Sequence, residues 1–279
     1  MKKLKFLAVL FLALSIGLYG CKKKNDNPEI IGNDNVIKTP SGKSCLLSKI
    51  KYGSGNDVFE YDSQNRPIKI SYYNGTTLEY YVTVTYSSSQ VVVKEYEANG
   101  QLDATQTFTA SNGVITGSSS TESWTSNGIT YTEAVQQTYE HNADGFLTKA
   151  TYNGTTTTNP ASTPQNFTGS TIYTYLNGNL VSKTETYGNE SRTTTYEYYT
   201  DKTNTLAPED EELLLTKANK NPVKKRIETY NAGNSTETSN YTYTYDSDGL
   251  ITKRTEVETF SQPGSIPNTN ENTFEYSCK

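Results

Sequence analysis

Hydrophobic and polar positions alternate along most of the chain with the two-residue period of a β-strand. The alternation is clear over residues 78–86, where one face carries Leu78, Tyr80, Val82, Val84 and Tyr86 and the other carries Glu79, Thr83 and Thr85. Three tyrosines over 241–245 repeat it with threonines opposite. The 23 tyrosines and the many threonines favour half-buried pleated surfaces, so the pattern predicts strands rather than helices.

A phrase returns along the chain: a tyrosine that ends an alternating stretch, an Asx-rich turn, and a shorter apolar stretch. Its tyrosines are spaced 35, 43, 36 and 70 residues apart, at Tyr61, Tyr96, Tyr139, Tyr175 and Tyr245. Most of these turns contain Asn-Gly or Asp-Gly, which supply the positive φ angles that tight hairpins need. A nearly fixed period predicts repeated structural units.

A second series of turn signals falls between these phrases, and we place it at the other ends of the strands. It comprises Asn74-Gly75, Asn127-Gly128, Asn153-Gly154, Gly188-Asn189 and Asn231 to Gly233. Turns at both ends predict one antiparallel up-and-down meander of about 14 to 16 strands over 45–279. Because long sheets twist, we expect it to curl into a barrel or half-barrel; a two-sheet sandwich is the alternative.

Two segments break the strand pattern. Residues 159–169 form a polar stretch with two prolines, which predicts a loop. Residues 201–222 form an insert in which Pro208 and the acids after it favour a short helix as far as Leu215. The leucines of this insert can plug one end of the sheet.

The first 20 residues have a basic start and an apolar run that is too short to span a bilayer comfortably, which is typical of a cleaved export signal. Leu18-Tyr19-Gly20-Cys21 resembles the lipobox of bacterial lipoproteins, which implies that Cys21 is acylated. An ordinary signal peptide beside an unrelated cysteine is the alternative. The polar residues 21–44, which contain Pro and Gly, predict a flexible tether.

Charge and cysteine usage narrow the class of protein further. The formal net charge of −5 becomes −8 once the three lysines of the signal are removed, which argues against a nucleic-acid partner. Cys45 opens the folded region and Cys278 is the penultimate residue. In an oxidising compartment this placement predicts a disulfide between the first and last strands, and two unpaired buried thiols are the alternative.

Candidate chemistry is sparse. The one histidine, His141, lies beside a predicted turn, and we interpret it as a solvated turn residue. The stretch Asp246-Ser-Asp248-Gly249 resembles the start of a calcium loop but lacks its remaining ligands, so we expect an ordinary turn, no metal and no cofactor. Nothing singles out a catalytic group, and we expect no enzyme.

Adjacent tyrosines are the remaining candidates for binding. In each pair, one ring points away from the core and can stack on a sugar or a protein partner; the candidates are Tyr72, Tyr73, Tyr80, Tyr81, Tyr198 and Tyr199. Cross-strand tyrosine ladders that only stabilise the sheet are the interpretation we prefer.

The tyrosine phrases are similar to the YD repeats of RHS-type shell proteins. The whole chain from about 45 to 278 resembles a family of uncharacterised bacterial lipoproteins with a porin-like fold. The matching elements are the lipobox, Cys45-Leu-Leu-Ser-Lys-Ile50, Lys217-Ala-Asn-Lys-Asn-Pro222 and Phe274-Glu-Tyr-Ser-Cys278. The resemblance implies the architecture and brings no activity. The faces expected to point outward carry Thr, Glu, Lys and Asn rather than an apolar band, so we expect the barrel itself not to span the membrane.

These features predict a non-catalytic, lipid-anchored protein of the outer membrane, on its periplasmic or its cell-surface side. We expect it to act by binding or adhesion, with a glycan or a protein as its ligand. A barrel that carries a lipid or another apolar ligand is one alternative. An envelope glycan hydrolase is the other, since the chain has 30 acidic residues and many carboxylate pairs are conceivable.

Overall fold

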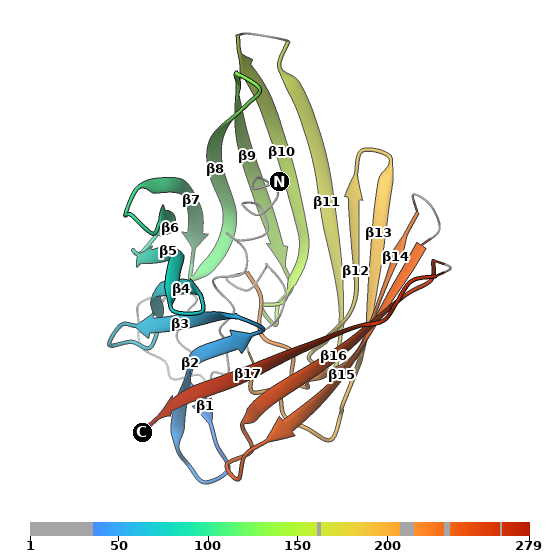
Figure 1. Cartoon of the computed structure of the whole chain (residues 1–279). Helices are drawn as coiled ribbons and strands as arrows, with labels where there is room; N and C mark the ends of the chain where they lie inside the picture. The colour runs from blue at the N-terminus through green and yellow to red at the C-terminus, as the bar shows by residue number, and fades with distance from the viewer. Residues whose placement is uncertain (1–35, 161–162, 207–214, 232–234, 263) are drawn as a thin grey trace.

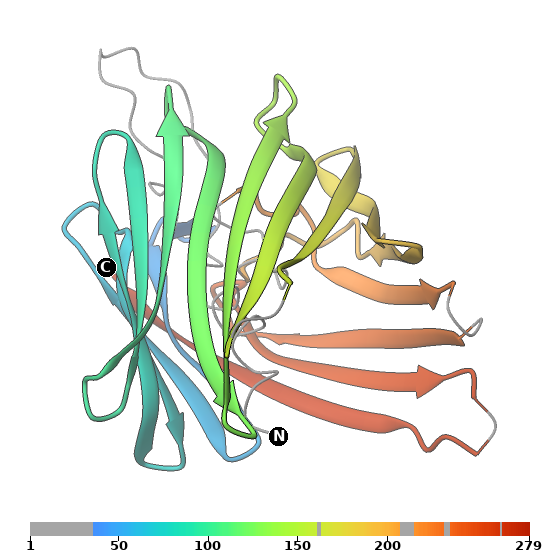
Figure 2. The same cartoon turned by 90° about the horizontal axis from the view of Figure 1, so that it is seen from above.

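The computed structural model describes residues 36–160, 163–206, 215–231, 235–262 and 264–279, which form one antiparallel sheet of 17 strands. Strands β2 to β17 follow one another as hydrogen-bonded neighbours, and β17 pairs in turn with β2. Sixteen strands therefore close into a barrel (Figures 1 and 2). The predicted up-and-down meander is confirmed in its barrel form, and the alternative sandwich is not formed.

The strands are β1 (Ile37–Lys38), β2 (Ser44–Tyr52), β3 (Gly55–Tyr61), β4 (Pro67–Asn74), β5 (Thr77–Tyr86), β6 (Gln90–Glu97), β7 (Leu102–Ser111), β8 (Val114–Ser126), β9 (Ile129–His141), β10 (Leu147–Asn159), β11 (Gln165–Leu176), β12 (Asn179–Tyr187), β13 (Glu190–Tyr198), β14 (Val223–Tyr230), β15 (Ser235–Tyr245), β16 (Ile251–Phe260) and β17 (Asn268–Cys278). None of the described residues forms a helix long and apolar enough to cross a membrane.

The turns of the repeated phrase have the expected backbone. Gly100, Gly145, Gly178 and Gly249 have φ angles between 79° and 84°, a conformation that favours glycine. An Asx oxygen accepts the backbone N–H groups two and four residues later in the turns that begin at Asp62, Asn142 and Asp246. The turn at Gly100 follows β6 rather than an odd-numbered strand, so it lies at the opposite end of the barrel from the other four.

The turn predicted at Asn153-Gly154 is wrong, because both residues lie inside β10. Gly154 faces Phe167 of β11, and a Cβ atom on this glycine would come within 2.0 Å of the Phe167 ring. The glycine is there to admit that ring rather than to turn the chain. The predicted 159–169 loop is also too long, since β10 runs to Asn159 and β11 begins at Gln165.

Four neighbouring strands make one side of the barrel taller than the rest. Strands β8, β9 and β10 have 13 residues each and β11 has 12, and they rise above their neighbours in Figure 1. We call these four strands the tall wall.

The seam between the first and last barrel strands is closed covalently. Cys45 of β2 faces Cys278 of β17 in the register of the sheet, and the two form a disulfide. This confirms the predicted bond. On the other edge of β2, Ile37 of β1 pairs with Cys45, so the last part of the predicted 21–44 tether is a strand against the barrel. Lys43 adds an ion pair to Asp248, with Nζ and Oδ2 2.5 Å apart.

The described part of the 201–222 insert crosses one opening of the barrel. Thr205 accepts the backbone N–H of Ile251 in β16, Thr216 accepts that of Leu147 in β10, and Asn219 accepts that of Leu180 in β12. Leu206 and Leu215 join the hydrophobic core there, and this core also contains Ile70, Val82, Val93, Leu147 and Ile251. We call this end the insert end and the opposite end the rim. Residues 207–214 of the predicted helix lie outside the described residues.

Tyrosine hydroxyls fasten the strands at the insert end. Each donates to a carbonyl near the start of the preceding strand over 2.5 to 2.9 Å: Tyr61 to Leu47, Tyr86 to Pro67, Tyr198 to Leu180, Tyr243 to Val223 and Tyr276 to Ile251. Because a buried hydroxyl needs a partner, these contacts explain why a tyrosine recurs where odd-numbered strands end. This tyrosine pattern supports the fold rather than a ligand.

Candidate functional site on the inner wall of the barrel

Alternation along the strands identifies the side chains that face the interior. In β15, Ser239 and Tyr241 are buried, whereas Asn240 between them and Thr242 after them are exposed. The inner face is apolar near the insert end and polar toward the rim. The polar part is the candidate functional site.

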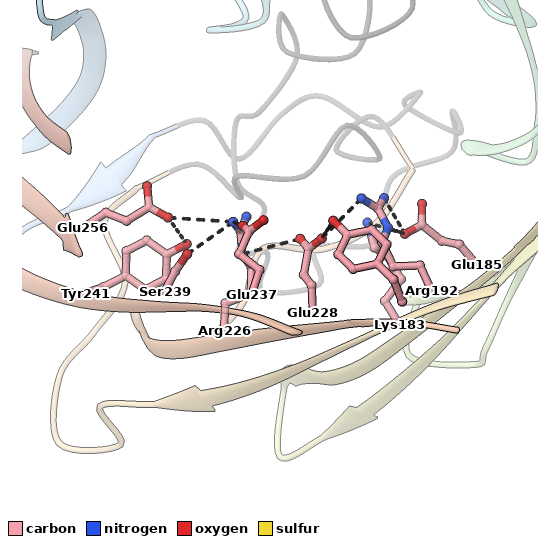
Figure 3. A network of polar contacts seen from close by, with 10 residues as sticks. Lys183, Glu185, Arg192, Arg226, Glu228, Glu237, Ser239, Tyr241 and Glu256 are labelled. Carbon is pink, nitrogen blue, oxygen red and sulfur yellow. Dashed lines mark hydrogen bonds and ion pairs between the residues drawn. The ribbon is translucent and has the colours of Figure 1, made fainter. Parts of the chain in front are cut away.

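Alternating acidic and basic side chains run across the inner face of β12 to β16 (Figure 3). We call this set the charged ladder: Glu185, Arg192, Glu228, Arg226, Glu237 and Glu256. Sheet register explains most of it, because Glu185 faces Arg192 on the neighbouring strand and Arg226 is the diagonal neighbour of Glu237. Opposite charges on facing or diagonal positions of adjacent strands attract.

The contacts in the charged ladder are close. Arg192 binds Glu185 at 2.6 Å through Nη2 and Glu228 at 3.3 Å through Nη1. Arg226 Nη2 lies 3.1 Å from Glu237 and 3.7 Å from Glu256. Hydroxyls complete the set, since Tyr230 donates to Glu228 at 2.8 Å and Tyr241 donates to Glu256 at 3.0 Å.

Solvent reaches part of the charged ladder. The side chains of Arg192 and Glu185 are 38% and 28% exposed, although both are on the inner face. Burial, followed by the hydrogen-bonding neighbour Glu258, raises the pKa of Glu237. Acidic groups exceed basic ones here, so the wall favours ligands rich in hydrogen-bond donors.

Three aromatic rings adjoin the charged ladder on the inner face of β10 to β12; Tyr152, Phe167 and Tyr187 form what we call the aromatic platform. Tyr152 faces Gly169 across the strands and Phe167 faces Gly154. A Cβ atom on either glycine would come within 2.0 Å of the opposing aromatic side chain. Each aromatic side chain therefore lies over the sheet, in the space that a side chain on the opposing glycine would occupy.

Tyr187 extends the aromatic platform toward the rim. Its ring centroid lies 6.3 Å from that of Tyr152, with the planes only 19° apart, and 6.2 Å from that of Phe167. Tyr187 is 53% exposed. Tyr187 follows Glu185 by two residues on the same face of β12, so the platform and the charged ladder adjoin. Burial, then Tyr187 and Glu185, raises the pKa of the Tyr152 hydroxyl.

The inner wall formed by β2 to β7 is also polar toward the rim. Tyr52 donates to Asp57 at 2.6 Å, and the rings of Tyr72 and Tyr80 stack at 4.2 Å. Burial raises the pKa of Asp57 to about 6, although the bond from Tyr52 opposes that shift. Burial, with acidic neighbours, raises the pKa of Glu95 to about 7.

The six paired tyrosines do not form one surface. Tyr72 is buried and the other five are half-buried. The rings of the cross-strand pairs Tyr72–Tyr80 and Tyr81–Tyr96 stack, with centroids 4.2 and 5.0 Å apart. The Tyr198 hydroxyl donates to the Leu180 carbonyl at the insert end. The Tyr199 hydroxyl donates to the Tyr241 carbonyl at 2.9 Å. Tyr73 faces Leu78 on β5. These contacts are those of cross-strand ladders, and ligand stacking by the six residues remains a prediction.

The other predicted polar residues have structural surroundings. His141 is half-buried rather than solvated: a ring nitrogen contacts the Leu215 carbonyl of the insert, and burial lowers its pKa. Asp246 binds its own turn and Asp248 binds Lys43 and Ser41. Within the described residues, no three His, Cys, Asp or Glu side chains gather as a metal site.

Neither the charged ladder nor the aromatic platform was predicted from the sequence. The signal that could have found the platform is Gly154 and Gly169, two glycines that were assigned to a turn and a loop from the sequence but lie inside β10 and β11. A glycine inside a strand often marks a close approach of another group.

The geometry defines an all-β closed barrel with an apolar, covered end and a polar inner wall toward the rim. Among solved structures, the chain is similar to a porin-like protein from Bacteroides uniformis, with 19% identity and a TM-score of 0.54 over 83% of this chain and 98% of that one. It is also similar to a porin-like protein from Bacteroides vulgatus, with 14% identity and a TM-score of 0.55 over 82% and 97% of the two chains. At these identities the likeness shows the fold alone, and it agrees with the porin-like part of the predicted resemblance.

Other comparisons add little. A structure of TcdB2-TccC3-Cdc42 aligns with 82% of this chain and 15% of its own chain, with a TM-score of 0.23. This score is too low to support the predicted similarity to YD repeats. No protein-family model matches the chain. No curated protein matches it either.

Proposed function

We propose that this protein is a lipid-anchored, non-catalytic binding protein of the bacterial envelope that holds a glycan against the inner wall of its barrel. The observation that carries the proposal is the aromatic platform, in which Tyr152 and Phe167 lie over glycines beside the charged ladder. Rings that lie over the sheet offer a face to the interior, where the C–H face of a sugar can pack. The neighbouring Glu185 and Arg192 supply hydrogen-bond partners for its hydroxyl groups.

A polar ligand fits this wall better than the lipid or apolar ligand considered from the sequence. Burying an apolar chain against Glu185, Arg192 and Glu228 would remove water from charged groups without replacing their hydrogen bonds. The apolar part of the interior is occupied by packed core side chains and by Leu206 and Leu215 of the insert.

Binding is also favoured over glycan hydrolysis. A retaining glycosidase needs its two carboxyl groups about 5 Å apart and an inverting one needs more, so that the sugar or a water fits between them. On this wall the pKa of Glu237 is raised by burial and then by a direct hydrogen bond with the Glu258 carboxyl group. This contact leaves no room for the reacting carbon.

We expect removal of a platform ring to weaken glycan binding by about fivefold or more, since a stacked aromatic ring contributes about 1 kcal/mol or more beyond its burial. The measurement is affinity electrophoresis of the mature protein in gels that contain starch, mannan, xylan or pectin. Wild type should be retarded by at least one of them, and Tyr152→Ala and Phe167→Ala should lose that retardation. Ile172→Ala is the matched control, because Ile172 is 53% exposed on the outer face of β11. Equal retardation of the ring variants, or no retardation of wild type by any of the four, would contradict the proposal.

The lipid anchor is tested separately. With the export signal and lipobox intact, cells grown with labelled palmitate should label wild type and not Cys21→Ala, and the variant should leave the membrane fraction. Acylation with two or more chains gives stable membrane attachment, whereas one chain gives only marginal attachment. Label that persists in Cys21→Ala would show that another residue is acylated.

A further inference from the structure

A cavity of about 500 Å³ lies at the insert end, beside the short strand β1. Three segments far apart in the sequence line it: residues 37–40 in and after β1, residues between 201 and 205 at the start of the insert, and residues 245–250 around the turn from β15 to β16. The first and last of these segments lie side by side at the bottom of Figure 1, where Ser41 donates to Asp248 at 2.8 Å. A volume of this size is typical of small-molecule pockets.

The buried part of the lining, which we call the floor, has its polar groups already paired. Thr39 and Thr205 are both buried. Thr39 Oγ1 accepts the backbone N–H of Lys43 at 3.0 Å, and Thr205 Oγ1 accepts that of Ile251 at 2.8 Å. A ligand group that reaches the floor therefore gains by being apolar. The apolar and aromatic side chains that line the cavity are Ile37, Pro40, Tyr245 and Leu250.

Tyr245 gives the cavity an aromatic side. It is the tyrosine of the repeated phrase at the end of β15, yet the hydroxyl that fastens this strand belongs to Tyr243, two residues earlier. Tyr245 and Asp201 both line the cavity. Burial, then the charge of Asp201, raises the pKa of the Tyr245 hydroxyl, so this hydroxyl stays neutral and can donate a hydrogen bond.

Charges of both signs line the cavity near solvent. Lys38, Asp201 and Lys202 are exposed, and Lys202 Nζ lies 3.5 Å from Asp201. An exposed ion pair of this kind contributes little to stability, so both partners can turn toward a ligand. Lys38 donates to a serine hydroxyl, and no ion pair among the described residues includes it. Asp248 already binds Lys43. A ligand therefore meets two ammonium groups and one carboxylate.

We propose that this cavity binds an α-amino acid with an apolar side chain. The apolar side chain packs on the floor against Tyr245 and Leu250. The carboxylate accepts hydrogen bonds from Lys38 and Lys202, and the ammonium group donates to Asp201. The cavity lies at the insert end and the aromatic platform lies toward the rim, so this proposal stands whether or not the protein binds a glycan.

Isothermal titration calorimetry of the mature protein at about pH 7 tests the ligand class. The ligands are L-phenylalanine, L-leucine, hydrocinnamate, phenethylamine and glycine. Hydrocinnamate lacks the ammonium group of phenylalanine, phenethylamine lacks its carboxylate, and glycine lacks the apolar side chain. We expect saturable binding of phenylalanine or leucine. Hydrocinnamate and phenethylamine should bind about threefold or more weakly than phenylalanine, and glycine about tenfold or more weakly.

Three results would overturn the proposal. Absence of binding by both phenylalanine and leucine would remove the site. Glycine that binds as tightly as they do would show that the floor takes no part. Hydrocinnamate or phenethylamine that binds as tightly as phenylalanine would show that the cavity does not recognise an amino acid.

Variants assign the charged contacts. Asp201→Asn should weaken binding of phenylalanine about threefold or more and leave hydrocinnamate unchanged, because hydrocinnamate has no ammonium group. Lys38→Gln should weaken both of these ligands and leave phenethylamine unchanged. Asp144→Asn, in the turn after β9, and Lys149→Gln, on β10, are the matched controls and should bind as wild type does. Equal losses for phenylalanine and hydrocinnamate in Asp201→Asn would overturn the ammonium contact. Unchanged phenylalanine binding in both Asp201→Asn and Lys38→Gln would overturn the site.

Discussion

A chain with serine in place of both Cys45 and Cys278 is expected to unfold with a free energy about 5 kcal/mol lower than that of the disulfide-bonded protein. The two cysteines are 233 residues apart, so the bond closes almost the whole folded chain into a loop. In the chain-entropy account, the unfolded state gains the most freedom when so long a loop is opened. The bond also joins β2 to β17, the pair that converts an open sheet into a barrel.

Denaturant unfolding of the oxidised protein, the reduced protein and the double serine variant measures this effect. The reduced protein and the variant should agree with each other and differ from the oxidised form in midpoint. Equal midpoints for all three would show that the hydrogen bonds of the seam hold the barrel without the disulfide.

Glu95→Gln is expected to raise the free energy of unfolding by about 3 kcal/mol at pH 8 and to leave it unchanged at pH 4. The pKa of Glu95 in the folded protein is about 7, above the ordinary value of 4.5. The folded state therefore holds this proton more tightly than the unfolded state. Its stability is fully present below about pH 4.5 and declines as the pH rises toward 7. Glutamine stays neutral and removes the decline.

Urea unfolding at intervals between pH 4 and pH 8 gives the curve for each variant. Wild type should lose stability across this range, and Asp57, whose pKa is about 6, should contribute to the loss at its lower end. The exposed Glu197→Gln variant should follow wild type throughout. A Glu95→Gln curve parallel to that of wild type would mean that the carboxyl group is not the source of the pH dependence.

The sequence was sufficient for the barrel because each strand carries its own information. Alternation defines the two faces, and the Asx-Gly turns at positive φ define where hairpins reverse. Asn153-Gly154 shows the limit of this reasoning. The dipeptide is a hairpin signal, yet its glycine serves a ring on the neighbouring strand, and no local pattern reports which residue lies across a sheet.

The polar inner wall could not be predicted from the sequence, for a different reason. Alternation separates two faces but does not say which faces inward when both are polar. Around Glu185, the neighbours Thr184 and Thr186 are also polar, so the inward charge is hidden among threonines. The charged ladder arises only when β12, β13 and β14 are placed in register, which brings together residues as far apart as 185 and 228.

The short strand β1 also fixes the end of the barrel from which the proposed tether leaves. It seats the start of the described chain at the insert end, where Lys43 and Ser41 hold Asp248. Ile37 follows Cys21 by sixteen positions, and a fully extended chain over that span reaches about 55 Å. With the proposed anchor at Cys21, the barrel would hang within that distance of the lipid surface, covered end nearest the membrane. The tall wall and the aromatic platform would then point away from the bilayer into the surrounding solution. A large glycan could reach them there without crossing the lipid headgroups.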